Sequence, residues 1–194
     1  SDEAHARFAA ARLEQDAAPN RQIVKTLDDL APPATRYGNA GVQNLLEAVM
    51  STITLIAVIV PLIWVGWLIL TEWVPMFPLN DLEASTVRER ATTGAMNYTV
   101  GLVIAGGVLV GELWSLVVAV VVSVLALAGH LVNWWLPYFG ISTQAQRDAY
   151  QREFTRTWKV LPTEGHDVVI DVQHMVVGVI TVVMVGTTLA AALA

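Results

Sequence analysis

Residues 114–135 read WSLVVAVVVSVLALAGHLVNWW and contain no Asp, Glu, Lys or Arg. At about 1.5 Å per residue, a helix from Trp114 to Trp134 is about 30 Å long, which is the thickness of a bilayer hydrocarbon core. Tryptophan prefers the headgroup level of a membrane, and it stands at both ends of this stretch. The stretch therefore predicts a transmembrane helix with tryptophan anchors at its two ends.

The composition of the chain agrees with an integral membrane protein. Of the 194 residues, 55% are hydrophobic and 14% are charged, and the mean hydropathy is +0.54. Soluble domains usually carry about a quarter charged residues. The net charge of −6 leaves no basic surface for nucleic acid. Because the chain has no cysteine, disulfides, thiolate zinc sites, iron–sulfur clusters and c-type haem attachment within it are excluded.

Three further apolar stretches predict an all-α integral membrane helical bundle. Residues 49–70 and 172–193 are each long enough to span a bilayer. Residues 92–110 are apolar and rich in glycine, which suits close packing of helices. Only the short turn at Gly111-Glu112 separates them from the span at 114–136, so three spans remain an alternative. Four spans are preferred, because three would leave an apolar run in water.

Two regions outside the spans have distinct patterns. Residues 1–40 form a polar N-terminal tail with two weak helical stripes, and residues 41–194 form the transmembrane domain. In the loop after the third span, a capping-box pattern precedes aromatic residues at every fourth position: Thr143, Gln146, Tyr150, Phe154 and Trp158. Residues 143–158 are therefore predicted to form an amphipathic interfacial helix, with its aromatic side against the bilayer or a neighbouring subunit.

The basic residues predict the orientation of the chain in the membrane. Cytoplasmic loops carry an excess of Lys and Arg. Most of the basic residues near the spans lie beside or within the connections at one end of the predicted bundle: Arg88, Arg90, Arg147, Arg152, Arg156 and Lys159. We therefore expect a multi-pass protein of the plasma (inner) membrane with the loop 138–168 in the cytoplasm.

Four side chains at the same predicted surface form the candidate site: His130, Asp167, Asp171 and His174. His130 lies near the end of the third span, and the other three follow at helical spacing where the fourth begins. Both histidines are expected to face protein, because an imidazole facing lipid would lose its hydrogen bonds. The four side chains suit a divalent metal, the two histidines suit the axial positions of haem b, and either set suits a quinone head group. The preferred alternative is structural, in which these residues cap helices and no cofactor is bound.

A block WW-x-PY-x-G occupies residues 134–140. A stretch rich in Arg, Tyr and Phe follows and closes in Leu161-Pro162, and His174 then opens the last span. Over about residues 111–185, this pattern resembles a group of small, uncharacterised multi-pass membrane proteins of actinobacteria. The resemblance implies kinship and no particular activity.

The functional expectations follow from the absence of catalytic motifs in the sequence. The chain has no GxSxG, Walker, HExxH or suitably placed GxGxxG pattern. The first expectation is a non-catalytic accessory or scaffolding subunit of a larger membrane complex, for example a respiratory one, with the lipid bilayer and other membrane subunits as partners. One alternative is a small redox or ligand-binding membrane protein that uses His130 and His174. Another is a small transporter, suggested by Pro61, Glu47 and Glu112.

Overall fold

The computed structural model describes residues 33–194, with side chains from residue 41 onward. The two helical stripes predicted in the polar tail lie outside the described residues. Helix α2 (Pro33–Trp73) begins before residue 41, the predicted start of the transmembrane domain. Proline is favoured at the first helical position, because an N–H there would have no partner within the helix. Residues 1–48 and 49–194 form two separate units, and the second unit holds the helical bundle.

Four helices in the described part of the chain are long and apolar enough to cross a membrane. No strand is formed anywhere in residues 33–194. The protein is therefore an all-α, multi-pass membrane protein, and the four-span interpretation is confirmed over the three-span alternative. The spans are Gly41–Trp73 in α2, then α3 (Val87–Val110), then the continuous α4 (Leu113–His130), η2 (Leu131–Trp135) and α5 (Leu136–Tyr138), and finally α7 (Val172–Leu193).

The turn between α3 and α4 is short because of one glycine. Gly111 has a φ of 71°, in the left-handed region that side chains disfavour, and its N–H donates to the carbonyl of Gly107. Glu112 then stands directly before α4. A chain reversal of this length is what allows two consecutive spans to pack as a hairpin.

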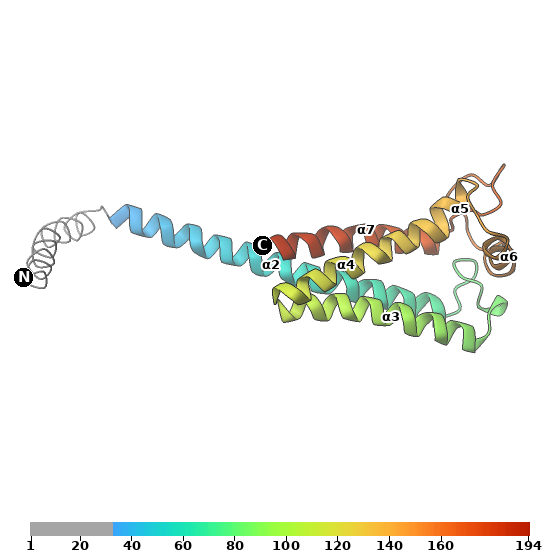
Figure 1. The fold of residues 1–194 in the computed structure, drawn as a ribbon, viewed down its shortest axis with the longest axis horizontal. Helices are drawn as coiled ribbons and strands as arrows, with labels where there is room; N and C mark the ends of the chain where they lie inside the picture. The colour runs from blue at the N-terminus through green and yellow to red at the C-terminus, as the bar shows by residue number, and fades with distance from the viewer. Residues whose placement is uncertain (1–32) are drawn as a thin grey trace, which may run out of the picture. The chain divides into compact units, whose positions relative to one another are not determined.

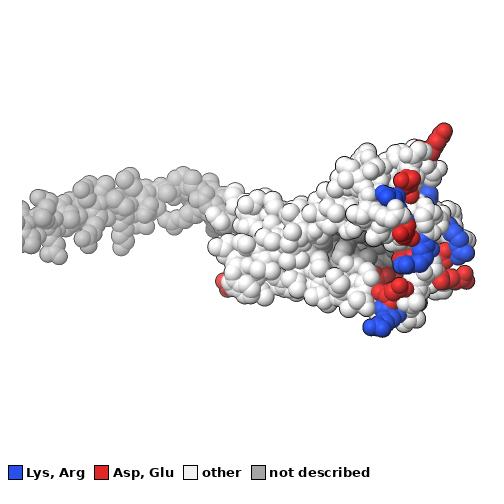
Figure 2. Space-filling model, turned by 45° about the vertical axis from the view of Figure 1, so that its right-hand side comes forward, with Lys and Arg blue, Asp and Glu red and all other residues white. Residues whose placement is uncertain are grey.

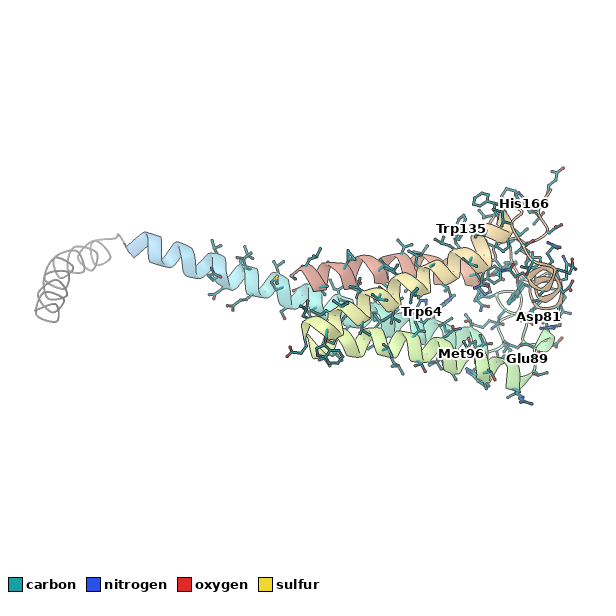
Figure 3. All side chains as sticks on the ribbon, in the orientation of Figure 1. Trp64, Asp81, Glu89, Met96, Trp135 and His166 are labelled. Carbon is teal, nitrogen blue, oxygen red and sulfur yellow. The ribbon has the colours of Figure 1, made fainter. Side chains whose placement is uncertain are left out.

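Within residues 49–194, the spanning helices lie side by side and alternate in direction (Figure 1). Helix α4 packs between α3 and α7. Helix α2 closes the ring, because it packs against α3 around Gly101 and donates a hydrogen bond from Trp64 Nε1 to Thr181 Oγ1 of α7, 3.0 Å long. In Figure 3, Trp64 lies among the bundled helices. Hydrogen bonds of this kind join helices where lipid offers no hydrophobic driving force.

The buried apolar side chains form one cluster toward the α3–α4 turn and a second toward the opposite end. Buried hydroxyl groups within the bundle donate to carbonyls of their own helix, so they cost little in this apolar setting. The first cluster contains Ala57, Val58, Ile104, Val108, Ala119, Met184 and Ala191. The second contains Trp64, Val65, Leu68 and Val177. The hydroxyls are those of Ser115, Ser123, Thr181 and Thr188.

Two connections form a polar layer at the end of the bundle opposite the α3–α4 turn, here called the loop end. One comprises residues 74–86 with the short helix η1 (Leu82–Ala84), and the other comprises residues 139–171 with α6 (Gln144–Glu153). Most charged side chains visible in Figure 2 gather at this end. The grouping of basic side chains that the sequence predicts is therefore present, because both connections lie at one end.

The predicted interfacial helix differs from the observed one. Helix α6 ends at Glu153 instead of residue 158, because the chain then pairs with residues before α7: Val160 N–H donates to Ile170 and Val172 N–H to Trp158. Tyr150 is 6% exposed, since it packs on Val168 and Val169 with Phe154 beside it. The prediction that these rings face the bilayer or a neighbouring subunit is wrong for Tyr150, and Trp158 is the one exposed side chain of the three aromatic residues, at 59%.

Candidate functional site

A cavity of about 490 Å³ lies between the four spanning helices at the loop end. The lining side chains farther from the loop end are mostly apolar, and those nearer to it are mostly polar. The deeper lining comprises Trp64, Leu68, Val100, Ala126, Val177 and Thr181. The lining nearer the loop end includes Glu72, Arg90, Asn97, His130, Asn133, Gln173 and His174. The cavity is therefore amphipathic along the bundle axis.

One face of α3 supplies a wall of the cavity. Arg90, Thr93, Asn97 and Val100 all line it, at spacings of three and four residues that place them on one side of a helix. The helix starts at a complete capping box, in which Thr86 and Glu89 each accept a hydrogen bond from the other's backbone N–H. This cap fixes where α3 begins, and therefore which residues turn toward the cavity.

Helix α4 widens where it reaches the cavity. The amide of Leu136 donates to the carbonyl of Leu131, five residues earlier, so residues 131–135 form a π-helical turn. Such turns are frequent at functional sites. In this turn Trp134 stacks on His174 with ring centroids 3.5 Å apart, and it meets Phe154 edge to face. The sequence predicts Trp134 as an anchor in the headgroups, but the structure places it in the lining of the cavity.

His130 is a buried polar side chain of the bundle, with 8% exposure. Its Nε2 is buried without a hydrogen-bond partner. The ring fits against α7 because residue 178 is glycine: a Cβ there would lie 2.5 Å from that nitrogen. The prediction that His130 and His174 face protein at one end of the bundle is confirmed, since both line the same cavity.

Asp171 holds His174 in place. Its Oδ1 accepts from the backbone N–H of His174 and lies 2.7 Å from the ring Nδ1, while its Oδ2 accepts from Thr157. Asp171 is 0% exposed and stands at the N-cap of α7. Burial by itself raises the pKa of this carboxyl, but the charge and hydrogen bonds of His174, with the Thr157 hydroxyl, lower it below its ordinary value.

The four side chains predicted to bind a metal are not brought together. Asp167 is exposed and precedes α7, which begins at Val172, so it does not share a helix face with Asp171 and His174. Extended backbone at the Asp171 cap accounts for this difference. In the part of the chain that the structure describes, no three His, Asp or Glu side chains converge as metal ligands.

The two histidines are also not arranged as axial ligands of a haem. Axial ligands approach the iron from opposite sides through a ring nitrogen. The Nε2 atom of His130 instead lies against Gly178, and His174 is covered on one face by Trp134. What the pair does provide is a polar, partly aromatic wall of the cavity.

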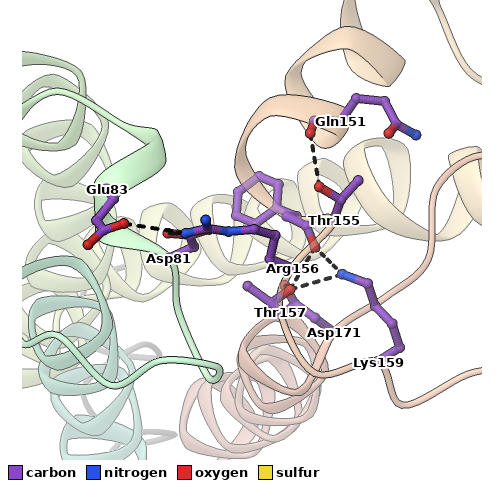
Figure 4. Close-up of polar contacts among 9 residues, drawn as sticks. Asp81, Glu83, Gln151, Thr155, Arg156, Thr157, Lys159 and Asp171 are labelled. Atoms are coloured by element: carbon purple, nitrogen blue, oxygen red, sulfur yellow. Dashed lines mark hydrogen bonds and ion pairs between the residues drawn. The ribbon is translucent and has the colours of Figure 1, made fainter.

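Ion pairs between the two connections border the cavity. Arg156 donates to both carboxylate oxygens of Asp81, at 2.6 and 2.8 Å, and also lies 3.6 Å from Glu83 (Figure 4). The Asp81 side chain is 4% exposed and lines the cavity. The hydrogen bond from Arg156 lowers the pKa of Asp81, so this pair stays ionised well into the acid range.

The walls formed by α2 and α3 are absent from the site predicted from the sequence. Glu72 and Arg90 lie near the ends of apolar helices, where an ionisable side chain is a signal of function. The helical spacing of Arg90, Thr93 and Asn97 also marks one polar face of α3. Comparison with known proteins gives no relative: no protein-family model, curated protein or solved structure matches this chain.

Proposed function

We propose that this protein binds a small amphipathic molecule in the cavity between α2, α3, α4 and α7. The observation that carries the proposal is that the lining changes from mostly apolar to mostly polar toward the loop end. A ligand with an apolar tail and a polar head matches both parts. The volume of about 490 Å³ lies in the range typical of small-molecule sites.

The buried, unpartnered nitrogen of His130 gives further support. An unsatisfied polar atom inside an apolar bundle costs free energy. Since His130 lines the cavity, a bound polar group there improves its surroundings. A quinone head group is one polar group of suitable size, as the sequence suggests for His130 and His174. The site as described needs no metal or haem for this role.

The proposal predicts that filling the deep part of the cavity removes a bound molecule. Ala126→Phe places a large ring where Ala126 lines the cavity, and Val124→Phe places the same ring on the exposed side of the same helix. We expect organic extracts of the purified wild type and Val124→Phe to contain the same lipophilic compound, and Ala126→Phe to retain about tenfold less of it. Mass spectrometry of the extracts measures the difference. Equal amounts in all three proteins contradict the proposal.

A role as a subunit of a larger complex is a second candidate, and it has its own observation. Helix α2 has 41 residues, about twice the number that a bilayer core requires. On residues 41–49, Val42, Leu45, Leu46 and Val49 are exposed at the spacing of one helix stripe. We expect native mass spectrometry after mild extraction to show a second protein bound, and Leu45→Glu to release it. A protein that runs alone with or without that change argues against this role.

We also propose an orientation of the protein in the membrane. The basic side chains at the loop end favour placing that end in the cytoplasm. The amphipathic cavity then takes its ligand's polar head near the cytoplasmic surface. Membrane-impermeant labelling of a single cysteine placed at Glu164 tests this side directly, since the chain has no other cysteine.

A further inference from the structure

Two charged side chains of the cavity have no partner of opposite charge among the described residues, and they identify the class of ligand. These are Glu72 of α2 and Arg90 of α3. The inference below rests on the proposed function, because it concerns what occupies the same cavity.

The hydrogen-bond partners of the Glu72 side chain are neutral. It accepts a short hydrogen bond from the hydroxyl of Tyr98, and that hydroxyl accepts from Trp73 Nε1 at 3.0 Å. Glycine at position 94 makes room for the carboxylate, because a Cβ there would lie 2.5 Å from its Oε2. Among the ion pairs of the described residues, none includes Glu72. Glu72 therefore lines the cavity with a carboxylate that forms no ion pair with the described residues.

Arg90 also forms no ion pair with the described residues. One terminal nitrogen donates to the carbonyl of Leu82 at 2.7 Å, but its Nε is buried without a hydrogen-bond partner. Its guanidinium lies 5.8 Å from the ring of Trp73, whose N–H leads through Tyr98 to Glu72. Arg90 therefore lies over the Trp73 ring, and Glu72 is connected to the N–H of the same ring through Tyr98. The Nε–H of Arg90 is therefore a free donor at the cavity, and Arg is well suited to phosphate and carboxylate groups.

The other acidic side chains of the cavity are already engaged. Asp81 pairs with Arg156, and Glu153 pairs with Arg152. Glu89 accepts hydrogen bonds in the capping box with Thr86 and lies 3.9 Å from Arg152. These pairs leave Glu72 and Arg90 as the charges that a ligand must match.

Matching both charges selects among ligand types. A purely cationic head leaves Arg90 unpaired, a purely anionic head leaves Glu72 unpaired, and a neutral head leaves both. Unpaired charges in a desolvated site are costly. We infer that the cavity takes a zwitterionic amphiphile. Its ammonium group pairs with Glu72, its phosphate or carboxylate group pairs with Arg90, and its apolar chain lies along Trp64, Leu68 and Val177.

The experiment compares head groups on one identical oleoyl-type chain. The probes are oleoyl-lysophosphatidylethanolamine (zwitterion), oleoyl-lysophosphatidylglycerol (anion), oleylamine (cation) and monoolein (neutral). Native mass spectrometry of the full chain in a neutral detergent measures binding of each probe. We expect the zwitterion to bind the wild type about tenfold more tightly than the other three, and to lose this advantage in Ala126→Phe.

Two charge variants assign the ends of the head group. We expect Glu72→Gln to weaken the zwitterion about tenfold and to spare the anion, and Arg90→Gln to weaken the zwitterion equally and to spare the amine. Matched controls are Glu112→Gln, at the α3–α4 turn, and Arg88→Gln, exposed on the same helix as Arg90. Both controls should bind the zwitterion like the wild type. The midpoint of thermal unfolding shows whether each variant is folded.

The outcomes separate the two proposals. Equal binding of all four probes, sensitive to Ala126→Phe, overturns the zwitterion inference and leaves the proposed function standing. Preference for a singly charged or neutral probe does the same. If none of the probes binds in a way that Ala126→Phe abolishes, the zwitterion inference fails, and the comparison of extracts from the wild type, Val124→Phe and Ala126→Phe decides the proposed function separately. Because the comparison of head groups uses the wild type, a charge variant that fails to fold does not remove the test.

Discussion

Replacing Asp171 with alanine is expected to lower the free energy of unfolding by about 3 kcal/mol. The substitution removes the N-cap of α7, leaves the His174 backbone N–H without its acceptor, and removes one of the two acceptors near the Thr157 hydroxyl. All of these groups are enclosed, since Asp171 is 0% exposed. Unfolding in mixed micelles of SDS and a mild detergent, followed by tryptophan fluorescence, measures the change.

Asp167 provides the matched control for this substitution. It lies four residues earlier on the same segment, but its side chain is exposed. We expect Asp167→Ala to change the stability by less than about 0.5 kcal/mol. Similar losses for both alanine variants would contradict the structural role assigned to Asp171.

The Asp171 carboxyl is also expected to make the stability of the protein depend on pH. Because the pKa of Asp171 in the folded protein is lower than its ordinary value of 3.8, its contribution to stability is present above that value. The contribution is lost as the pH falls through the lowered pKa. Asp171→Asn keeps a cap-forming side chain that cannot titrate. When the pH is lowered from 4 by about 1 to 2 units, we therefore expect the variant to lose less stability than the wild type. If the stability of the wild type and of Asp171→Asn falls by equal amounts with pH, the lowered pKa does not belong to Asp171.

Gly107→Ala is expected to destabilise the bundle by about 2 kcal/mol. A Cβ at residue 107 would lie 2.7 Å from the carbonyl oxygen of Ser115 and 3.0 Å from the Cβ of Ala119, so the hairpin of α3 and α4 must open to admit it. The obstruction includes backbone, which cannot rotate away as a side chain can. The same mixed-micelle unfolding measures the loss.

The neighbouring glycine is the control for Gly107. A Cβ at Gly106 meets nothing within 4 Å. Gly106→Ala should therefore leave the stability unchanged or raise it by up to about 1 kcal/mol, because alanine favours the helix. A loss at residue 106 as large as that at residue 107 would mean that helix propensity or lipid contact, and not the α3–α4 contact, controls the response.

Part of the site was predictable from the sequence because local spacing decides it. The capping boxes at Thr86 and Thr143 are both formed, since each needs only residues within one turn. His130 was predictable as an inward-facing residue, because lipid offers an imidazole no hydrogen bonds. The space beside Gly178 is filled by the His130 ring, a contact between two helices that spacing along the chain does not reveal.

The sequence by itself favoured four spans over three, and it determined their limits near residues 110 and 172 and the gathering of basic residues at one end. These features depend on the composition of about 20 consecutive residues and on alternating chain direction. Only the tertiary structure decided that Gly107 rather than Gly106 meets α4, that Trp134 turns inward, and that α6 stops at Glu153. It also decided that Glu72 and Arg90 share a cavity with the two histidines. Each of these depends on how helices rotate against partners far away in the chain, and that rotation is settled by packing between surfaces, which hydropathy and spacing within a single segment do not specify.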